Sequence, residues 1–201
     1  DDVNYIKRGW INKNRILQNG EITSFTLPVQ KASQNRKINQ HQRTEDNKIL
    51  EKLKRQVQVS YAKAPNFDEA FELICQLIDL PQTNLAKYLG NSIVKISDYL
   101  GIETKFCFSS QLSHHDDWDY AQQRIIHITK QLGGDQYLNL PGGKKLYQAE
   151  TFAELNIKLQ FISPKLFNYQ QQTSKGFEPA LSIIDILMCA TKDEIATSLQ
   201  Q

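Results

Sequence analysis

The pattern of hydrophobic and polar positions in the first half of the chain predicts a hairpin followed by three helices. Asn19-Gly20 separates an apolar pair at 16–17 from an apolar run at 22–29, and an Asn-Gly pair in this setting is a strong signal for a hairpin turn. A polar stretch at 31–42 has no core-forming pattern and predicts a loop. Apolar residues then recur at helical spacing. They predict helices that cover about 46–57, 67–78 and 85–100.

The stretch 101–147 predicts a strand, a helix and a second strand. The first strand is predicted at 105–108 and the second at 136–140, because both runs are short and rich in strand-forming residues. Gly133-Gly134 is expected to end the helix between them. The apolar face of this helix is predicted to hold Ala121, Ile125, Ile128 and Leu132. Such a βαβ unit would bring the loops 109–117 and 139–144 to the same edge of a sheet.

The remainder of the chain predicts one more strand and two more helices. The run 157–162 alternates as a strand, 164–179 is irregular, and 181–189 is an apolar helix. Thr191 and Glu194 have the spacing of a capping box that starts a last helix. Together these patterns predict a single α/β domain over 1–201, with a largely parallel, Rossmann-like sheet flanked by helices and an antiparallel N-terminal hairpin.

The composition is that of an ordinary globular protein, with 40% hydrophobic and 23% charged residues in 201. No apolar run approaches the length of a membrane span, and no signal peptide is visible, so we expect no membrane insertion. Three cysteines are widely spaced in apolar segments. We interpret them as reduced core thiols, which favours the cytoplasm.

Positive charge is concentrated in the segment 31–63. This segment holds nine Lys or Arg residues and three Asp or Glu residues, so its net charge is +6 and that of the remainder is −4. A basic, partly helical segment of this kind could contact the phosphates of a nucleotide-linked substrate or of an RNA. The alternative is a solvated helix face and loop.

Titratable side chains are most concentrated at 114–117. His114 and His115 can transfer protons near neutral pH, and with Asp117 they are the candidate catalytic residues. No HxH or HxxxH spacing is present, so we predict no metal site. In the alternative interpretation, Asp116 or Asp117 caps the following helix and the histidines are simply exposed.

The predicted helix and the glycine turn after the second strand supply candidate binding residues. Arg124 could hold a phosphate or carboxylate in a bidentate manner, or it could pair with a surface acid. Gly142 and Gly143 would let a ligand approach the backbone, or they could serve a tight turn with positive φ. The other candidates in this part of the chain are Ser110, Tyr137, Asn139 and Tyr147.

Hydrogen-bonding and aromatic side chains are dense in the first fifteen residues. This composition suits recognition of a sugar or nucleotide, where a ring stacks and amides bind hydroxyl groups. The alternative is an amphipathic edge segment whose Trp10 fills the core. The candidates are Asp2, Tyr5, Arg8, Trp10, Asn12 and Arg15. Covalent nucleophilic catalysis lacks support, since no Gly-x-Ser-x-Gly elbow occurs and Cys107 has no activating neighbour in sequence.

Three segments resemble the WbqC-like protein family. They are DDVNYIKRGWINKNR at 1–15, YLNLPGGKKLY at 137–147 and LSIIDILM at 181–188, in the order that the family shows. The resemblance implies a bacterial protein whose gene lies among genes for O-antigen and other surface polysaccharides, with glycyl transfer suggested for some members. Family members begin with a further segment that carries Gln/His-Pro and aromatic-Pro-Gly. We therefore expect that an N-terminal segment is missing here.

The residues and the resemblance together favour a transferase that acts on a small-molecule or carrier-linked sugar precursor, with an aminoacyl donor such as a charged tRNA. The sequence identifies no cofactor. A second hypothesis is a non-catalytic protein that binds a nucleotide sugar or an RNA. A nucleotidyltransferase is a third, and it would need a carboxylate cluster beyond Asp116-Asp117 to bind metal and triphosphate.

Overall fold

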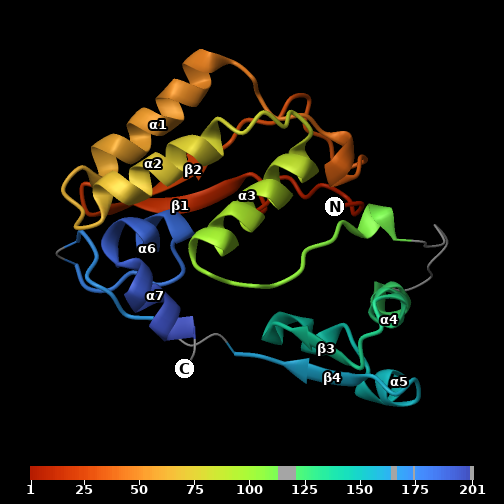
Figure 1. Ribbon diagram of the computed structural model, residues 1–201. Coiled ribbons are helices and arrows are strands. Elements are labelled where there is room, and N and C mark those ends of the chain that lie inside the picture. Colours follow the sequence, from red (N-terminus) through yellow and green to blue (C-terminus); the bar gives the residue numbers. More distant parts are fainter. Residues whose placement is uncertain (113–120, 164–166, 174, 200–201) are drawn as a thin grey trace. The chain divides into compact units, whose positions relative to one another are not determined.

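The computed structural model describes residues 1–112, 121–163, 167–173 and 175–199. These residues form two compact units. The large unit comprises Asp1–Phe106 and Phe167–Gln201, and the small unit comprises Cys107–Leu166. In Figure 1 the large unit is coloured red to yellow-green and blue, and the small unit green to cyan.

The predicted hairpin is present at the start of the large unit. Strand β1 (Lys13–Gln18) pairs antiparallel with β2 (Glu21–Thr26), and Gln18 lies opposite Glu21. The two turn residues, Asn19 and Gly20, have φ values of 53° and 75°. A two-residue turn that matches the twist of its strands needs positive φ at both positions, and Asn-Gly tolerates this. The local prediction is therefore confirmed.

The predicted helices of the large unit are also present. Asp46 caps the first of them by accepting a hydrogen bond from the Lys48 N–H at 2.8 Å. At the start of the last, Thr191 N–H donates to Glu194 Oε2 at 2.7 Å and Glu194 N–H donates to Thr191 Oγ1 at 3.3 Å, which is the predicted capping box. The helices are α1 (Asn47–Tyr61), α2 (Phe67–Ile78), α3 (Leu85–Tyr99), α6 (Ile183–Cys189) and α7 (Lys192–Leu199), with a 3₁₀ turn η1 at Ile38–Gln40.

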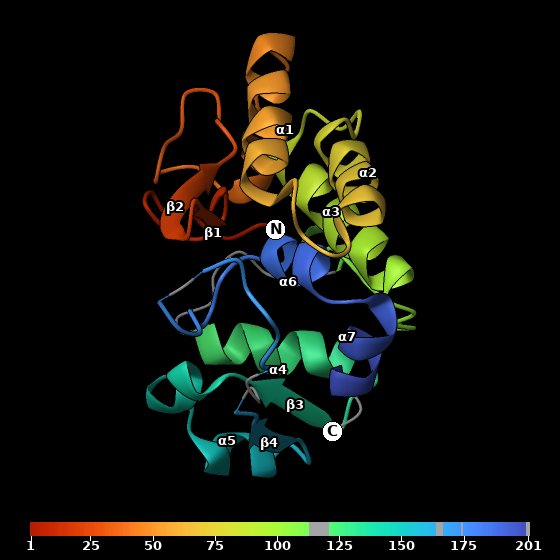
Figure 2. The same cartoon turned by 90° about the vertical axis from the view of Figure 1, so that its left-hand side faces the viewer.

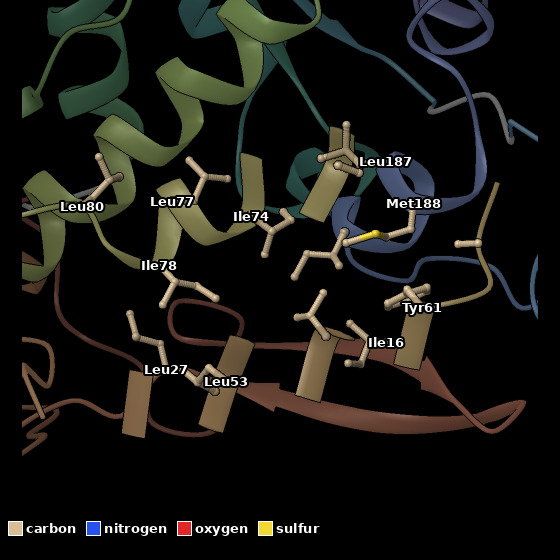
Figure 3. Packing of buried hydrophobic residues seen from close by; sticks show 14 of the residues in the cluster. Ile16, Leu27, Leu53, Tyr61, Ile74, Leu77, Ile78, Leu80, Leu187 and Met188 are labelled. Atoms are coloured by element: carbon tan, nitrogen blue, oxygen red, sulfur yellow. The ribbon is translucent and has the colours of Figure 1, made fainter. Parts of the chain in front are cut away.

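The core of the large unit lies between the hairpin and these helices. α1 packs against both β1 and α2, and α2 packs against α6 (Figures 1 and 2). Figure 3 shows side chains from the hairpin, α1, α2 and α6 meeting in one layer. The labelled residues of this layer are Ile16, Leu27, Leu53, Tyr61, Ile74, Leu77, Ile78, Leu80, Leu187 and Met188. The layer joins segments that lie at opposite ends of the sequence.

One carboxylate is buried within this core. Asp185, in α6, is fully buried and accepts hydrogen bonds from the Tyr61 and Tyr169 hydroxyls, each at 2.7 Å, and from Gln171 Nε2 at 3.2 Å. The Tyr61 oxygen in turn accepts the Leu17 N–H at 3.1 Å. Burial, together with the nearby carboxylate, raises the pKa of both tyrosines above the ordinary value. Both hydroxyls therefore stay protonated and act as donors.

Two of the cations in the basic segment 31–63 have structural roles. Arg43 is buried, donates from Nε to the Gln82 carbonyl at 2.9 Å and lies 4.6 Å from the Tyr88 ring centroid. Lys54 pairs with Glu51 and with Asp79, each at 2.7 Å. The segment is helical at 47–61, and residues 31–46 hold η1 and isolated β-bridges but no strand. Arg43 and Lys54 are thus held by the protein's own groups.

The small unit contains a parallel pair of strands. β3 pairs with β4 so that Tyr137 lies opposite Leu159. The small core consists of Ile126, Phe152 and Ile157. The elements are η2 (Ser109–Gln111), α4 (Ala121–Gln131), β3 (Gln136–Asn139), η3 (Pro141–Lys145), α5 (Ala149–Ala153) and β4 (Lys158–Phe161). The chain passes from β3 to β4 through η3 and α5, so the βαβ unit runs from 136 to 161.

This arrangement corrects three expectations. The run 105–108 is not a strand, and the loop 109–117 therefore does not follow one. The buried positions of α4 are Ile126 and Thr129, while Leu132 is 56% exposed, so the apolar face is shifted from the predicted stripe. A strand needs partners for its backbone N–H and C=O groups. Within the described residues, the run 105–108 pairs with no other strand.

The fold class is confirmed at the coarse level only. The described residues form a mixed α/β structure with one two-stranded antiparallel sheet and one two-stranded parallel sheet. Within those residues no larger parallel sheet occurs, so the Rossmann-like arrangement is not confirmed.

Two expectations about exposure have different outcomes. Cys189 is buried and Cys75 half-buried, but Cys107 is exposed and is not a core thiol. Burial raises the pKa of Cys189 to about 12, which keeps this thiol protonated. None of the helices in the described ranges combines the length and apolar character needed to cross a membrane.

The Asp185 network predicts unequal effects of two tyrosine substitutions. Tyr61→Phe leaves Asp185 Oδ1 and the Leu17 N–H without this partner, and we expect it to lower the free energy of unfolding by about 1–3 kcal/mol. Tyr169→Phe leaves Oδ2 bonded to Gln171 and should cost less. Urea unfolding followed by circular dichroism measures both. Equal losses would contradict this account of the network.

Candidate functional site

The N-terminal segment is held in place by two of the predicted site residues. Tyr5 is buried, and its hydroxyl donates to Asn12 Oδ1 at 2.6 Å. Asn12 Nδ2 donates to the Leu27 carbonyl at 2.7 Å. The Tyr5 ring also lies 4.7 Å from the ring of His41, which is fully buried. Tyr5 and Asn12 thus tie the segment to the hairpin, with their polar atoms already bonded.

Trp10 presents an aromatic face outside the core. It is 66% exposed, so it does not fill the core as the alternative interpretation required. The Arg15 guanidinium lies 5.6 Å from its ring centroid, and Arg15 Nη2 donates to the Ala180 carbonyl at 2.8 Å. Arg15 therefore restrains the indole from one side. Arg8 is exposed with φ 64°, whereas Asp2 is buried.

A pocket of about 210 Å³ lies beside Trp10 in the large unit. Its deep walls are buried side chains of the core, and Lys13 is exposed at the surface. The hairpin, the preceding segment, α1, α2, α3 and the start of α6 all contribute to it. The lining residues are Trp10, Ile11, Asn12, Lys13, Asn14, Phe25, Leu27, Leu53, Ile74, Leu77, Ile78, Tyr88, Leu89, Ser92, Ile96, Ser182, Ile183 and Ile184.

In the small unit the glycine turn brings Asn139 and Tyr147 together. A Cβ atom added at Gly143 would lie 2.3 Å from Asn139 Nδ2 and 3.1 Å from a Tyr147 ring carbon, so both side chains cover this glycine. At Gly142 the same position is open, with nothing within 4 Å. Neither glycine has positive φ. Close approach, and not turn geometry, is therefore the reason for Gly143.

An aromatic cluster supports this turn. Tyr137 and Tyr147 meet edge to face with centroids 5.9 Å apart, and Tyr137 stacks on Phe152 at 5.8 Å. Burial, with a hydrogen bond to Tyr147, raises the pKa of Tyr137 to about 12. Tyr137 is therefore protonated at neutral pH and can act as a hydrogen-bond donor.

The other candidates of the small unit are only partly described. Arg124, in α4, donates from Nη2 to Ser109 Oγ at 3.2 Å, and Ser110 is exposed in η2. His114, His115 and Asp117 lie outside the described residues, so their proposed catalytic role stays a prediction. Among the residues described, no three His, Cys, Asp or Glu side chains are grouped so that they could hold a metal ion.

Sequence reasoning missed most of the pocket. Trp10 and Asn12 were predicted as site residues and do line it, but Leu89, Ser92 and Ile183 were not among the predicted site residues. Each of these lies in an ordinary amphipathic helix, and no local pattern separates a pocket wall from a core position. Asp185 was equally unpredicted as a buried polar group. Its sequence signal was a single acid within the apolar run at 181–188.

Comparison with known proteins gives a family and one relative. The profile of the WbqC-like protein family matches residues 1–197. The uncharacterized protein Rv1507c of Mycobacterium tuberculosis (strain ATCC 25618 / H37Rv) is 27% identical over 198 residues, which covers 93% of this chain and 80% of that protein. No solved structure matches.

The two glycines of the turn predict a matched pair of substitutions. Gly143→Ala should displace Asn139 and Tyr147 and lower the stability of the small unit by about 1–3 kcal/mol, the usual cost of overpacking. Gly142→Ala has open space and should leave stability within about 0.5 kcal/mol. Thermal unfolding of both variants checks this. The assignment of Gly143 to close packing would be wrong if the two variants unfolded alike.

Proposed function

Because the chain belongs to the WbqC-like protein family, we propose that it transfers a glycyl or other small acyl group to a sugar precursor of a bacterial surface polysaccharide such as O-antigen. The resemblance supports the pathway. The observation that carries the sugar part of the proposal is the exposed Trp10 face, restrained by Arg15, beside a pocket. The reaction would take place in the cytoplasm.

The sugar would bind at the rim of the large-unit pocket. The Trp10 indole offers a flat apolar face to the C–H face of a sugar ring, and Asn14 and Arg8 supply polar groups in the same segment. Tyr5 and Asn12 would position this segment, since their polar atoms are engaged with each other and with the hairpin. Arg15 would hold the indole at its angle and present positive charge.

The glycine turn of the small unit would hold an anionic part of the donor or of the carrier. Gly142 is exposed and has open space beside it, so a phosphate can approach its backbone closely. Arg124 would provide a charge-assisted contact in the same unit. Asn139, which covers Gly143, would orient a hydroxyl group at this turn.

The chemical step would be attack of a sugar hydroxyl or amino group on the activated carbonyl of the donor. His114 or His115 would accept the proton of the attacking group, and Asp117 would orient that histidine. The donor's leaving group would depart as the new ester or amide bond forms, with the histidine returning the proton to it. These roles follow from residue chemistry.

A transfer assay tests the proposal. The protein would be incubated with a panel of nucleotide sugars and either glycyl-tRNA or acyl thioesters, and mass spectrometry would detect a sugar with the added acyl mass. Replacing both histidines by alanine should lower kcat by about 10²–10⁴-fold, the usual contribution of general base catalysis, while the melting temperature stays unchanged. Trp10→Ala should instead raise KM, and Trp10→Phe should raise it less because a ring remains.

Binding measured in parallel separates the competing functions. A nucleotide sugar that raises the melting temperature without any product would favour a non-catalytic binding protein. An RNA whose affinity falls steeply as salt rises would favour contacts through the basic segment 31–63. If none of these compounds binds and none is a substrate for transfer, the proposal is contradicted.

A further inference from the structure

The pocket of the large unit extends beyond the rim at which we place the sugar ring. We propose that it binds an aliphatic acyl chain whose anionic end lies at Lys13. This site concerns binding alone, and it holds whether or not the chain catalyses the transfer proposed above. The argument rests on the chemistry, size and charge of the lining.

Three polar side chains of the lining already have partners within the protein. Asn12 bonds to Tyr5 and to the Leu27 carbonyl, and Ser92 Oγ lies 3.0 Å from the Tyr88 carbonyl and 2.9 Å from the Leu89 carbonyl. Ser182 Oγ accepts the Ile184 N–H at 3.3 Å. A sugar placed inside would lose its hydrogen bonds to water, while these three side chains are already bonded within the protein. Burial of each sugar hydroxyl would therefore cost free energy. An apolar chain has no hydroxyl groups that must leave water, so this cost does not arise.

The walls behind these groups are apolar and buried. Leu53, Ile74, Leu77, Ile78 and Ile184 are all at most 7% exposed, and all of them line the pocket. They come from α1, α2 and α6, so the pocket reaches from the exposed Trp10 into the main core. A chain that enters it would be removed from water along its length, which is the source of the binding energy.

The volume sets the length of the chain. A cavity of about 150 Å³ accommodates benzene, with its six carbons. The pocket here measures about 210 Å³. At the same packing it holds roughly eight carbons. A short or medium acyl chain therefore fits, and a long-chain lipid would leave most of its length outside.

The charge at the surface selects an anionic end. Among the described residues that line the pocket, Lys13 is the one charged side chain, and it is exposed at the start of β1. Arg15 lies on the same strand as Lys13, and its guanidinium lies near the Trp10 ring. This second cation adds to the positive potential there. A carboxylate or phosphate at the polar end of the chain would meet these cations, whereas an ammonium would be repelled.

A homologous series of carboxylates tests the site directly. In Trp118→Phe, Trp10 is the single tryptophan, because the chain has two, and its fluorescence reports on the pocket. Butanoate, hexanoate, octanoate and decanoate would be titrated. We expect the Kd to fall about fourfold for each added CH₂, the factor that corresponds to about 0.8 kcal/mol per buried methylene, and to level off near eight carbons. Octylamine should bind more weakly than octanoate.

A filling variant and a matched control locate the binding. Leu89→Phe places a larger side chain in the pocket and should weaken octanoate binding at least tenfold. Ile93→Phe makes a similar enlargement on the same helix, at a position that is 53% exposed and not in the lining, and should leave binding unchanged. Ser92→Leu is a second filling variant if Leu89→Phe does not fold.

The inference would be overturned by a Kd that does not change with chain length, by octylamine binding as tightly as octanoate, or by loss of binding in Ile93→Phe as large as in Leu89→Phe. Failure of the transfer assay with intact octanoate binding would leave this site standing and remove only the proposed reaction. Binding of octanoate that Leu89→Phe and Ser92→Leu do not weaken would place the chain elsewhere and contradict the site.

Discussion

The buried carboxylate of Asp185 constrains the large unit more than any single apolar contact. A carboxyl group removed from water is tolerated only when its oxygens are hydrogen-bonded, and here the bonded donors are two hydroxyls and an amide. Those donors come from α1 and from the segment 167–173. The Tyr61 oxygen also accepts the Leu17 N–H, so the network includes β1. Misplacing either segment would leave the carboxylate without at least one of its donors.

The same constraint shapes the pocket. α6 begins two residues before Asp185, and its first residues line the pocket together with residues next to β1. The Ser182 N–H donates to the Arg15 carbonyl at 2.8 Å, and the Arg15 side chain donates to Ala180. The start of α6 is thus fixed to the strand that carries Lys13 and Arg15. These bonds fix the part of the wall that α6 contributes relative to the charged rim of the pocket.

Local sequence signals predicted the fold wherever local groups decide the structure. The Asn19-Gly20 turn and the Thr191/Glu194 capping box each depend on a few neighbouring residues, and each is present. The strand predicted at 105–108 failed because a strand depends on a partner far away in sequence. β3 was predicted correctly, but its parallel partner is β4. The resulting sheet has two strands, and periodicity alone could not exclude a larger one.

The candidate site shows the same division between local and non-local information. The density of polar and aromatic residues in the first fifteen positions identified the rim, yet it could not separate Tyr5 and Asn12, whose polar atoms bond internally, from the exposed Trp10. The difference is that Tyr5 and Asn12 have partners inside the protein, namely the His41 ring beside Tyr5 and the Leu27 carbonyl bonded to Asn12. The pocket walls come from four helices, so only folding brings them together. The large unit offers an apolar pocket and the small unit offers a glycine turn, and the two units have separate cores. Because substitutions without shared partners have additive effects, the apolar pocket and the glycine turn are open to separate alteration.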